Sequence, residues 1–165
     1  MRDWVVCMLL CSFLFFLAPT ATLGEEMNKE NGQGYAFAGF GAVNASDSTL
    51  HFGGGVEPIL YKGLGFGVEV GYLGPTRHLD QGIGILSLDG QYTFNTGSST
   101  KLRPFLTGGY TLAFRSGTAN AVNFGGGLHY WFAERVGLRL EFRDHASTQL
   151  WNTHAWQGRI GFDFR

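Results

Sequence analysis

Apolar and polar side chains alternate along residues 83–94, and the same alternation recurs through the rest of the chain. One set of alternate residues is leucine or glycine and ends in Tyr92 and Phe94, whereas the other set includes Ser87, Asp89 and Gln91. A β-strand places successive side chains on opposite faces, so a period of two predicts a strand with one apolar face and one mixed polar face. The strand would be about a dozen residues long. That is enough to cross a bilayer at a tilt, which takes roughly nine to eleven residues.

This pattern predicts eight strands, at 35–43, 50–60, 64–73, 83–94, 102–114, 122–132, 136–145 and 154–165. The strand at 35–43 is so rich in glycine and alanine that the sequence leaves its facing open. The connections are expected to alternate between longer loops, such as 115–121 and 146–153, and shorter turns, such as 61–63 and 133–134. Eight is the smallest common strand number for a closed transmembrane barrel. We therefore expect an all-β fold, an eight-stranded antiparallel up-and-down transmembrane β-barrel at 34–165.

Composition agrees with a barrel whose outer surface does not face water. Charged residues make up 15% of the 165 residues, which is below the roughly one quarter usual for soluble domains. Aromatic residues also reach 15%, and there are 26 glycines. The formal net charge of -1 offers no basic excess, so nucleic acid is not an expected partner.

The N-terminus has the features of a cleavable signal peptide. Arg2 precedes an uncharged apolar run at 4–17, and small residues follow at 18–24. An apolar run this short at the start of a chain is typical of an export signal; an uncleaved anchor is the alternative. Cleavage is expected after Gly24 or Ala21, and the segment 25–33 would then form a short polar leader.

Both cysteines, Cys7 and Cys11, lie inside this N-terminal segment. Leu10 precedes Cys11, which argues against a lipoprotein cleavage site. The exported chain would therefore have no disulfide, no thiol nucleophile and no thiolate metal site.

Alternation alone does not say whether the apolar face points inward, as in a soluble lipid-carrying barrel, or outward to lipid. Three features favour the outward arrangement. Charges are confined to one face, bulky aromatic residues gather toward the strand ends as in interfacial girdles, and the signal peptide sends the chain out of the cytoplasm. Five acidic residues and four arginines on the polar face can pair across the lumen.

These arguments define two sets of residues. The expected interior charge network is Glu57, Glu69, Asp89, Arg103, Arg139, Glu141, Arg143, Arg159 and Asp163. The expected lipid-facing and girdle residues are Tyr72, Leu86, Leu88, Tyr92, Phe94, Phe114, Phe132, Leu138, Leu140, Phe142, Trp156, Phe162 and Phe164.

Several glycine-rich and aromatic motifs resemble those of the outer-membrane β-barrel domain family, the small eight-stranded OmpA-like and OmpX-like barrels. They lie at 34–41, 51–57, 63–72, 124–131 and 161–164. The resemblance implies insertion into the outer membrane through recognition of the C-terminal strand. Members of the family usually end that strand on an aromatic residue, whereas here Phe164 is followed by Arg165.

Few groups of residues in the sequence suggest a catalytic or ligand-binding site. The glycine triplets at 53–55 and 125–127 are not followed by a helix, as a phosphate-binding loop requires, so mid-strand packing explains them better. His51 and His129 share the polar face without an identifiable third ligand, so no metal site is expected. His145 and Ser147 are two residues apart on one face, where the imidazole could accept the hydroxyl proton. Lipid A deacylases, which are also small outer-membrane barrels, carry a similar His-x-Ser pair; here no acidic residue follows closely enough to orient His145.

The sequence therefore predicts a small, monomeric protein of the outer membrane of a Gram-negative bacterium, with a structural or surface-interaction role and no open pore. Its expected partners are outer-membrane lipid, lipopolysaccharide and the insertion machinery, with no cofactor. Two alternatives remain: a lipid A deacylase-like hydrolase that uses His145 and Ser147, and a small porin.

Overall fold

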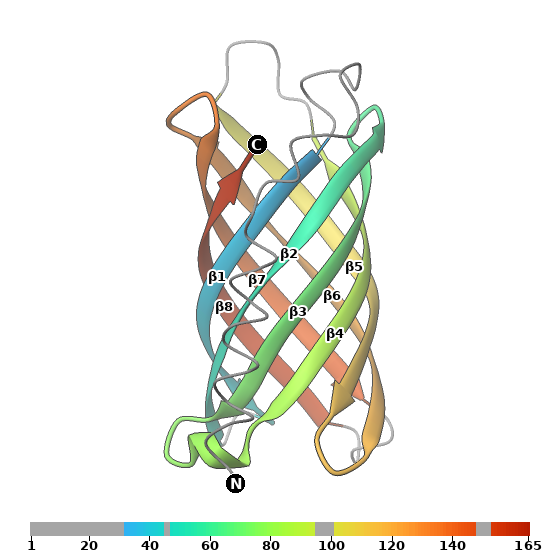
Figure 1. Cartoon of the computed structure of the whole chain (residues 1–165), viewed down its shortest axis with the longest axis vertical. Helices are drawn as coiled ribbons and strands as arrows, with labels where there is room; N and C mark the ends of the chain where they lie inside the picture. The colour runs from blue at the N-terminus through green and yellow to red at the C-terminus, as the bar shows by residue number, and fades with distance from the viewer. Residues whose placement is uncertain (1–31, 45–46, 95–100, 148–152) are drawn as a thin grey trace, which may run out of the picture.

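The computed structural model describes residues 32–44, 47–94, 101–147 and 153–165, which form one closed antiparallel barrel. The expected signal peptide at 1–24 and most of the expected leader lie outside the described residues. The eight strands are β1 (Gly32–Val43), β2 (Asp47–Tyr61), β3 (Leu64–Pro75), β4 (Ile83–Thr93), β5 (Leu102–Phe114), β6 (Thr118–Trp131), β7 (Val136–Ser147) and β8 (Thr153–Phe164), with a short 3-10 helix η1 (Leu79–Gln81). The barrel is an up-and-down arrangement, as the sequence predicts (Figure 1).

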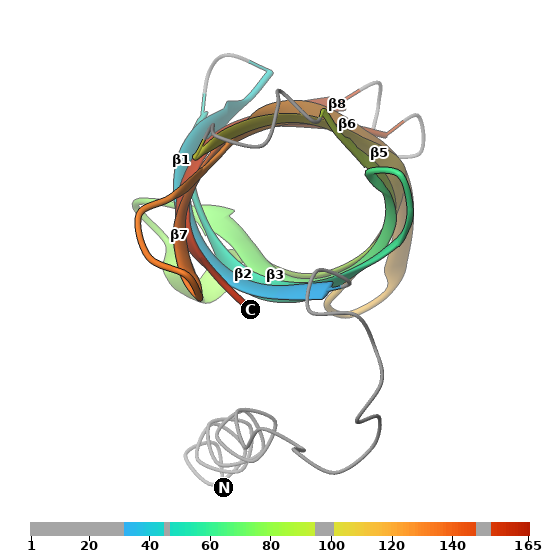
Figure 2. The same ribbon diagram turned by 90° about the horizontal axis from the view of Figure 1, so that it is seen from above.

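Each strand pairs with its neighbours in sequence, and β1 closes the ring by pairing with β8, for example Ala38 with Ile160. The view along the barrel shows the closed ring (Figure 2). Closure removes the unpaired strand edges that would otherwise carry unsatisfied backbone groups in a membrane. Among the described residues, no helix is long and apolar enough to span a membrane.

The two ends of the barrel differ in the connections that they carry. β1 begins and β8 ends at the upper end in Figure 1, which we call the terminus end, and 62–63 and 132–135 connect strands there. The opposite end, which we call the loop end, carries the connections 76–82 and 115–117.

The expected alternation of long loops with short turns is wrong. β6 begins at Thr118 and β7 continues to Ser147, so the strand ladder includes residues that the sequence assigned to loops. The reason is that Thr118–Ala121 pair with Ala113 and its neighbours through the backbone, although their side chains show no clear apolar alternation. At the terminus end, Lys62 (φ 45°) and Gly63 (φ 88°) both have positive φ, as the central residues of a tight two-residue hairpin turn require.

The structure shows which side chains point into the barrel and which point outward. In β4, Ile85, Ser87, Asp89 and Gln91 are buried, whereas the residues between them are exposed or half-buried. All thirteen expected lipid-facing residues lie on the outer wall, ten of them exposed and Tyr72, Leu86 and Leu138 half-buried. In β1, whose facing the sequence left open, Tyr35 and Phe37 point inward.

Candidate functional site

A network of buried charges fills the middle of the lumen, and we call it the lumenal ion network. Its members come from β2, β3, β4, β7 and β8, so that it joins strands on opposite sides of the ring. Every member is at most 5% exposed. The network consists of Glu57, Glu69, Asp89, Arg139, Glu141, Arg143, Arg159 and Asp163.

Arg139 of β7 is the anchor of the network toward the terminus end. Its Nη1 and Nη2 donate to the Glu57 carboxylate at 2.9 and 3.0 Å, and its Nε donates to Glu141 Oε2 at 2.9 Å. The guanidinium carbon lies 4.2 Å from the centroid of the Tyr35 ring and 4.5 Å from that of Phe105. Arg139 thus makes a bidentate contact to a carboxylate while its guanidinium lies between two aromatic rings. This geometry suits the planar guanidinium and not the ammonium of lysine.

Arg143 carries the network across the lumen. Its Nε donates to Glu141 Oε1 at 2.6 Å, and its Nη1 donates to Asp89 Oδ2 on β4 at 2.7 Å. Glu141 thus holds both arginines of its own strand, one with each carboxylate oxygen.

Arg159 of β8 forms a second crossing. Its two terminal nitrogens contact both oxygens of Glu69 on β3, and Tyr35 Oη donates to the same carboxylate at 2.8 Å. The Arg159 guanidinium carbon lies 3.4 Å from the centroid of the Phe37 ring. At the terminus end, His129 Nδ1 lies 2.6 Å from Asp163 Oδ2.

Arg103 lies outside this network. It is half-buried as the second residue of β5, and no ion pair joins it to a charged side chain within the described parts of the chain. The three arginines of the network therefore face five carboxylates, so acidic side chains outnumber the arginines by two.

The sequence did not reveal the uncharged side chains that donate hydrogen bonds to the carboxylates of the network. Gln33 and Gln91 both donate to Glu57 Oε2, and Asn123 donates to Asp89 Oδ1. Tyr35 and Phe37 were missed because the alternation in 35–43 did not reveal their facing. Only the position of Gln91 on the polar face of its strand could have suggested a role, because Gln33 fell in the expected polar leader.

A pocket of about 450 Å³ lies between the network and the loop end of the lumen, and we call it the mouth pocket. Aliphatic side chains from five strands form most of its wall, namely Val43, Leu73, Ile83, Ile85, Ala113 and Ala155. Thr111, His145, Ser147 and Thr153 are its polar residues, and Ala121 completes the lining.

His145 and Ser147 both line this pocket, but their side chains bond elsewhere. Ser147 Oγ donates to the Asn120 carbonyl oxygen at 2.7 Å, and His145 Nδ1 lies 3.2 Å from Thr111 Oγ1. The carboxylate of Asp144 points to the other face of β7, where it lies 2.7 Å from His154 Nδ1. The hydrogen bond between base and nucleophile that the hydrolase alternative requires is thus not formed, and the adjacent acid does not orient His145.

In the described part of the chain, no three His, Cys, Asp or Glu side chains cluster in a way that could hold a metal ion. His51, one of the two histidines weighed as ligands, packs edge-on against Phe37 and His145, with ring centroids 4.8 and 5.7 Å apart. His129, the other, is occupied by Asp163.

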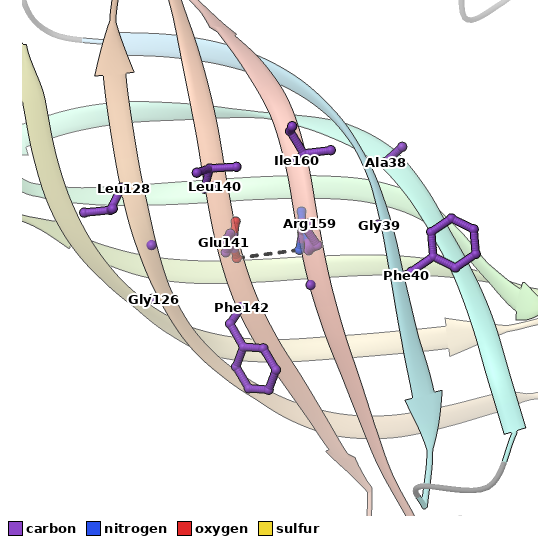
Figure 3. A pocket seen from close by; sticks show the side chains of 12 residues that line it. Ala38, Gly39, Phe40, Gly126, Leu128, Leu140, Glu141, Phe142, Arg159 and Ile160 are labelled. Atoms are coloured by element: carbon purple, nitrogen blue, oxygen red, sulfur yellow. Dashed lines mark ion pairs between the residues drawn. The ribbon is translucent and has the colours of Figure 1, made fainter.

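The outer wall carries a separate apolar groove of about 570 Å³ over β1, β6, β7 and β8 (Figure 3). Its floor is made of small residues, Ala38, Gly126 and Gly158, between the bulky side chains of Phe40, Leu140 and Phe142. Glu141 and Arg159 lie behind this wall, where their ion pair belongs to the lumen. Such a groove is shaped for hydrocarbon.

The sequence matches no family model and no curated protein. Solved structures give the informative comparison. The N-terminal β-barrel domain of Pseudomonas aeruginosa OprF aligns over 81% of this chain and 96% of that domain, with 20% identity and a TM-score of 0.62.

The fold is that of the small outer-membrane β-barrels. Neisserial surface protein A aligns over 81% of this chain and 94% of its own, with 12% identity and a TM-score of 0.61. The outer-membrane enzyme PagL aligns over 79% of this chain and 99% of its own, with 17% identity and a TM-score of 0.54. This fold is thus shared by an enzyme and by barrel proteins whose names state no enzymatic activity. The fold alone does not define the function, which has to be argued from the residues of the lumen.

Proposed function

We propose that this protein is an integral outer-membrane barrel without an open channel, which acts in the envelope as a structural element or through its surface loops. The observation that carries the proposal is the lumenal ion network, in which arginines of β7 and β8 reach carboxylates of β2, β3 and β4. An eight-stranded barrel is only just wide enough for side chains to fill it. Cross-lumen ion pairs between buried groups therefore leave little room for a continuous water path.

The outer wall supports the membrane location. Large apolar side chains are exposed all around the barrel, an arrangement that water would penalise and hydrocarbon favours. Aromatic side chains lie on the outer wall near both ends, among them Tyr92, Phe132 and Phe164 near the terminus end and Phe114 and Trp156 near the loop end. These rings suit the two interfaces of a bilayer.

The proposed orientation places the terminus end in the periplasm, because an exported chain would be inserted from that side. The loop end would then face the cell exterior, where it can contact lipopolysaccharide. Recognition by the insertion machinery would use β8, whose outward residues include Phe162 and Phe164. We propose a monomer, because every strand of the closed barrel is already paired on both sides.

An enzymatic role is not part of the proposal. His145 and Ser147 lie inside the lumen and engage Thr111 and Asn120 rather than each other. A hydrolase of membrane lipid would need a nucleophile that the lipid can reach.

Planar-bilayer recording tests the proposal. The refolded protein should give no steady unitary conductance. Arg143→Ala, which removes the link between Glu141 and Asp89, should increase the frequency of brief openings, whereas Arg77→Ala in the exposed connection at 76–82 should not. A stable open state with reproducible steps in the unaltered protein would overturn the proposal and favour a small porin.

A further inference from the structure

We infer that the mouth pocket is a binding site for an uncharged aliphatic molecule that carries one hydroxyl or carbonyl group. The inference rests on the chemistry of the pocket wall, on a buried nitrogen in that wall that lacks a hydrogen-bond partner, and on the charge of the adjacent lumenal ion network.

The wall of the mouth pocket selects for hydrocarbon. Leu73, Ile85 and Ala155 form a buried cluster, against which Val43, Ile83 and Ala113 pack. The pocket volume of about 450 Å³ falls within the roughly 300–1,000 Å³ of small-molecule sites, and barrel mouths are common places for such sites. A methylene group and a water molecule take similar volumes, about 30 Å³, so a molecule of about a dozen non-hydrogen atoms would fit.

One polar atom in this wall lacks a partner. His145 is 6% exposed, and its Nε2 is buried with no hydrogen-bond partner among the described residues. Leaving a buried polar atom unpaired is unfavourable, so a group that pairs with it gains binding free energy. Because Nδ1 already contacts Thr111, Nε2 is the ring nitrogen left for a ligand, as donor or acceptor according to the tautomer.

Hydrogen bonds between His145 and the lumenal ion network hold the imidazole in place. Thr111 Oγ1 accepts from Asn123 Nδ2 at 3.0 Å, and the same amide nitrogen lies 2.7 Å from Asp89 Oδ1. Asp89 is in turn held by Arg143. The polar end of the pocket is therefore tied to the lumenal ion network and is organised before a ligand arrives.

Charge decides between ligand classes. Among the described residues, no Lys, Arg, Asp or Glu side chain lines the mouth pocket, and the adjacent lumenal ion network has three arginines against five carboxylates. A carboxylate or phosphate head would meet this excess of negative charge, and a cationic head would find no carboxylate in the wall. An uncharged hydroxyl or carbonyl suits both conditions.

The experiment is an NMR titration of the whole barrel in lipid nanodiscs with 1-octanol. All aliphatic probes dissolve in the bilayer, so the readout is site-specific: saturable shifts of Ile85 and Ala113 inside the pocket, compared with Leu88 on the outer wall. We expect saturation at the pocket residues only. Octanoate and octyltrimethylammonium should bind at least tenfold more weakly.

Three variants sharpen the test. Ala113→Phe fills the pocket and should abolish the saturable shifts, which in that variant are read at Ile85, whereas Ala146→Phe adds the same ring to the outer wall and should preserve them. His145→Phe keeps a ring of similar size and removes Nε2. It should weaken 1-octanol binding about three- to tenfold and leave octane binding unchanged, which a merely structural role for His145 would not produce.

Each variant is first checked for folding by its heat-dependent gel mobility, and Ala121→Leu replaces Ala113→Phe if the latter fails. Linear, unsaturable shifts at Ile85 and Ala113, or equal effects of Ala113→Phe and Ala146→Phe, would overturn the inference and leave a mouth filled by water. Tighter binding of either charged analogue would overturn the assignment of the ligand class.

Discussion

Removal of Glu141 should destabilise the barrel more than removal of any other single carboxylate of the lumenal ion network. Glu141 is the one described carboxylate whose two oxygens accept hydrogen bonds from two different arginines, Arg139 at 2.9 Å and Arg143 at 2.6 Å. Glu141→Ala leaves both guanidinium groups without that partner in the middle of the lumen. Because the site is closed off, water cannot readily replace the carboxylate.

The contacts that remain after Glu141→Ala determine how much free energy of unfolding is lost. Breaking a buried ion pair by removing one partner costs about 3–5 kcal/mol. Arg139 keeps its contact with Glu57 and Arg143 keeps Asp89, so we expect a loss at the lower end of this range, about 3 kcal/mol. Glu141→Gln keeps one acceptor oxygen and should lose about half as much, since a hydrogen bond to a charged group contributes about 1.5–3 kcal/mol.

The assay is reversible urea unfolding in lipid vesicles, followed by tryptophan fluorescence. Glu134→Ala is the matched control, because Glu134 is an exposed glutamate in the connection at 132–135. The expected order of the free energies of unfolding is Glu134→Ala equal to the unaltered protein, then Glu141→Gln, then Glu141→Ala as the least stable. Equal stability of Glu141→Ala and Glu134→Ala would refute the view that the network holds the barrel together.

Two further predictions concern architecture and catalysis. The unboiled protein, from residue 25 onward, should migrate differently from the boiled protein on an electrophoresis gel and show β structure by circular dichroism, because a closed barrel has no free edge from which to unravel; a strongly helical spectrum would contradict the fold. Expression of the protein should leave the acylation pattern of the host's lipid A unchanged, and Ser147→Ala should not alter that result. Loss of an acyl chain that depends on both His145 and Ser147 would establish the hydrolase instead.

The sequence predicted the strands best where polar and apolar residues differ most. In β4 and β7 the charged residues fix the register of the faces, because a shift of one residue would expose Asp89 or Arg139 to the outer wall. In β1 the small residues at 36, 38 and 39 carry no such information, so the inward positions of Tyr35 and Phe37 emerged only from the structure. The start of β6 was missed for the same reason, since Thr118–Ala121 join the ladder through backbone pairing without an apolar alternation of their side chains.

The partners of the charges could not be predicted from alternation. A period of two places Glu57 and Arg139 on the inner face, but their contact joins residues 82 positions apart and depends on the tilt and stagger of the strands around the ring. The mouth pocket depends on the same stagger, because it forms where the ends of β1, β3, β4, β5, β6, β7 and β8 meet. The position of Arg103 at the edge of the lumen follows from its place at the beginning of β5.

The central claim is that the outer wall faces hydrocarbon while the charges lie inside, and one pair of matched substitutions tests it directly. Leu88 is the middle residue of β4 and Leu64 is the first residue of β3; both are outward and exposed, at 44% and 52%. An arginine on the lipid face costs about 2–4 kcal/mol at the bilayer midplane and about 0–1 kcal/mol near the interface. In urea unfolding from lipid vesicles, Leu88→Arg should therefore lose about 2–4 kcal/mol, and Leu64→Arg at most about 1 kcal/mol. Equal losses at the two positions would show that the wall does not cross a hydrocarbon layer.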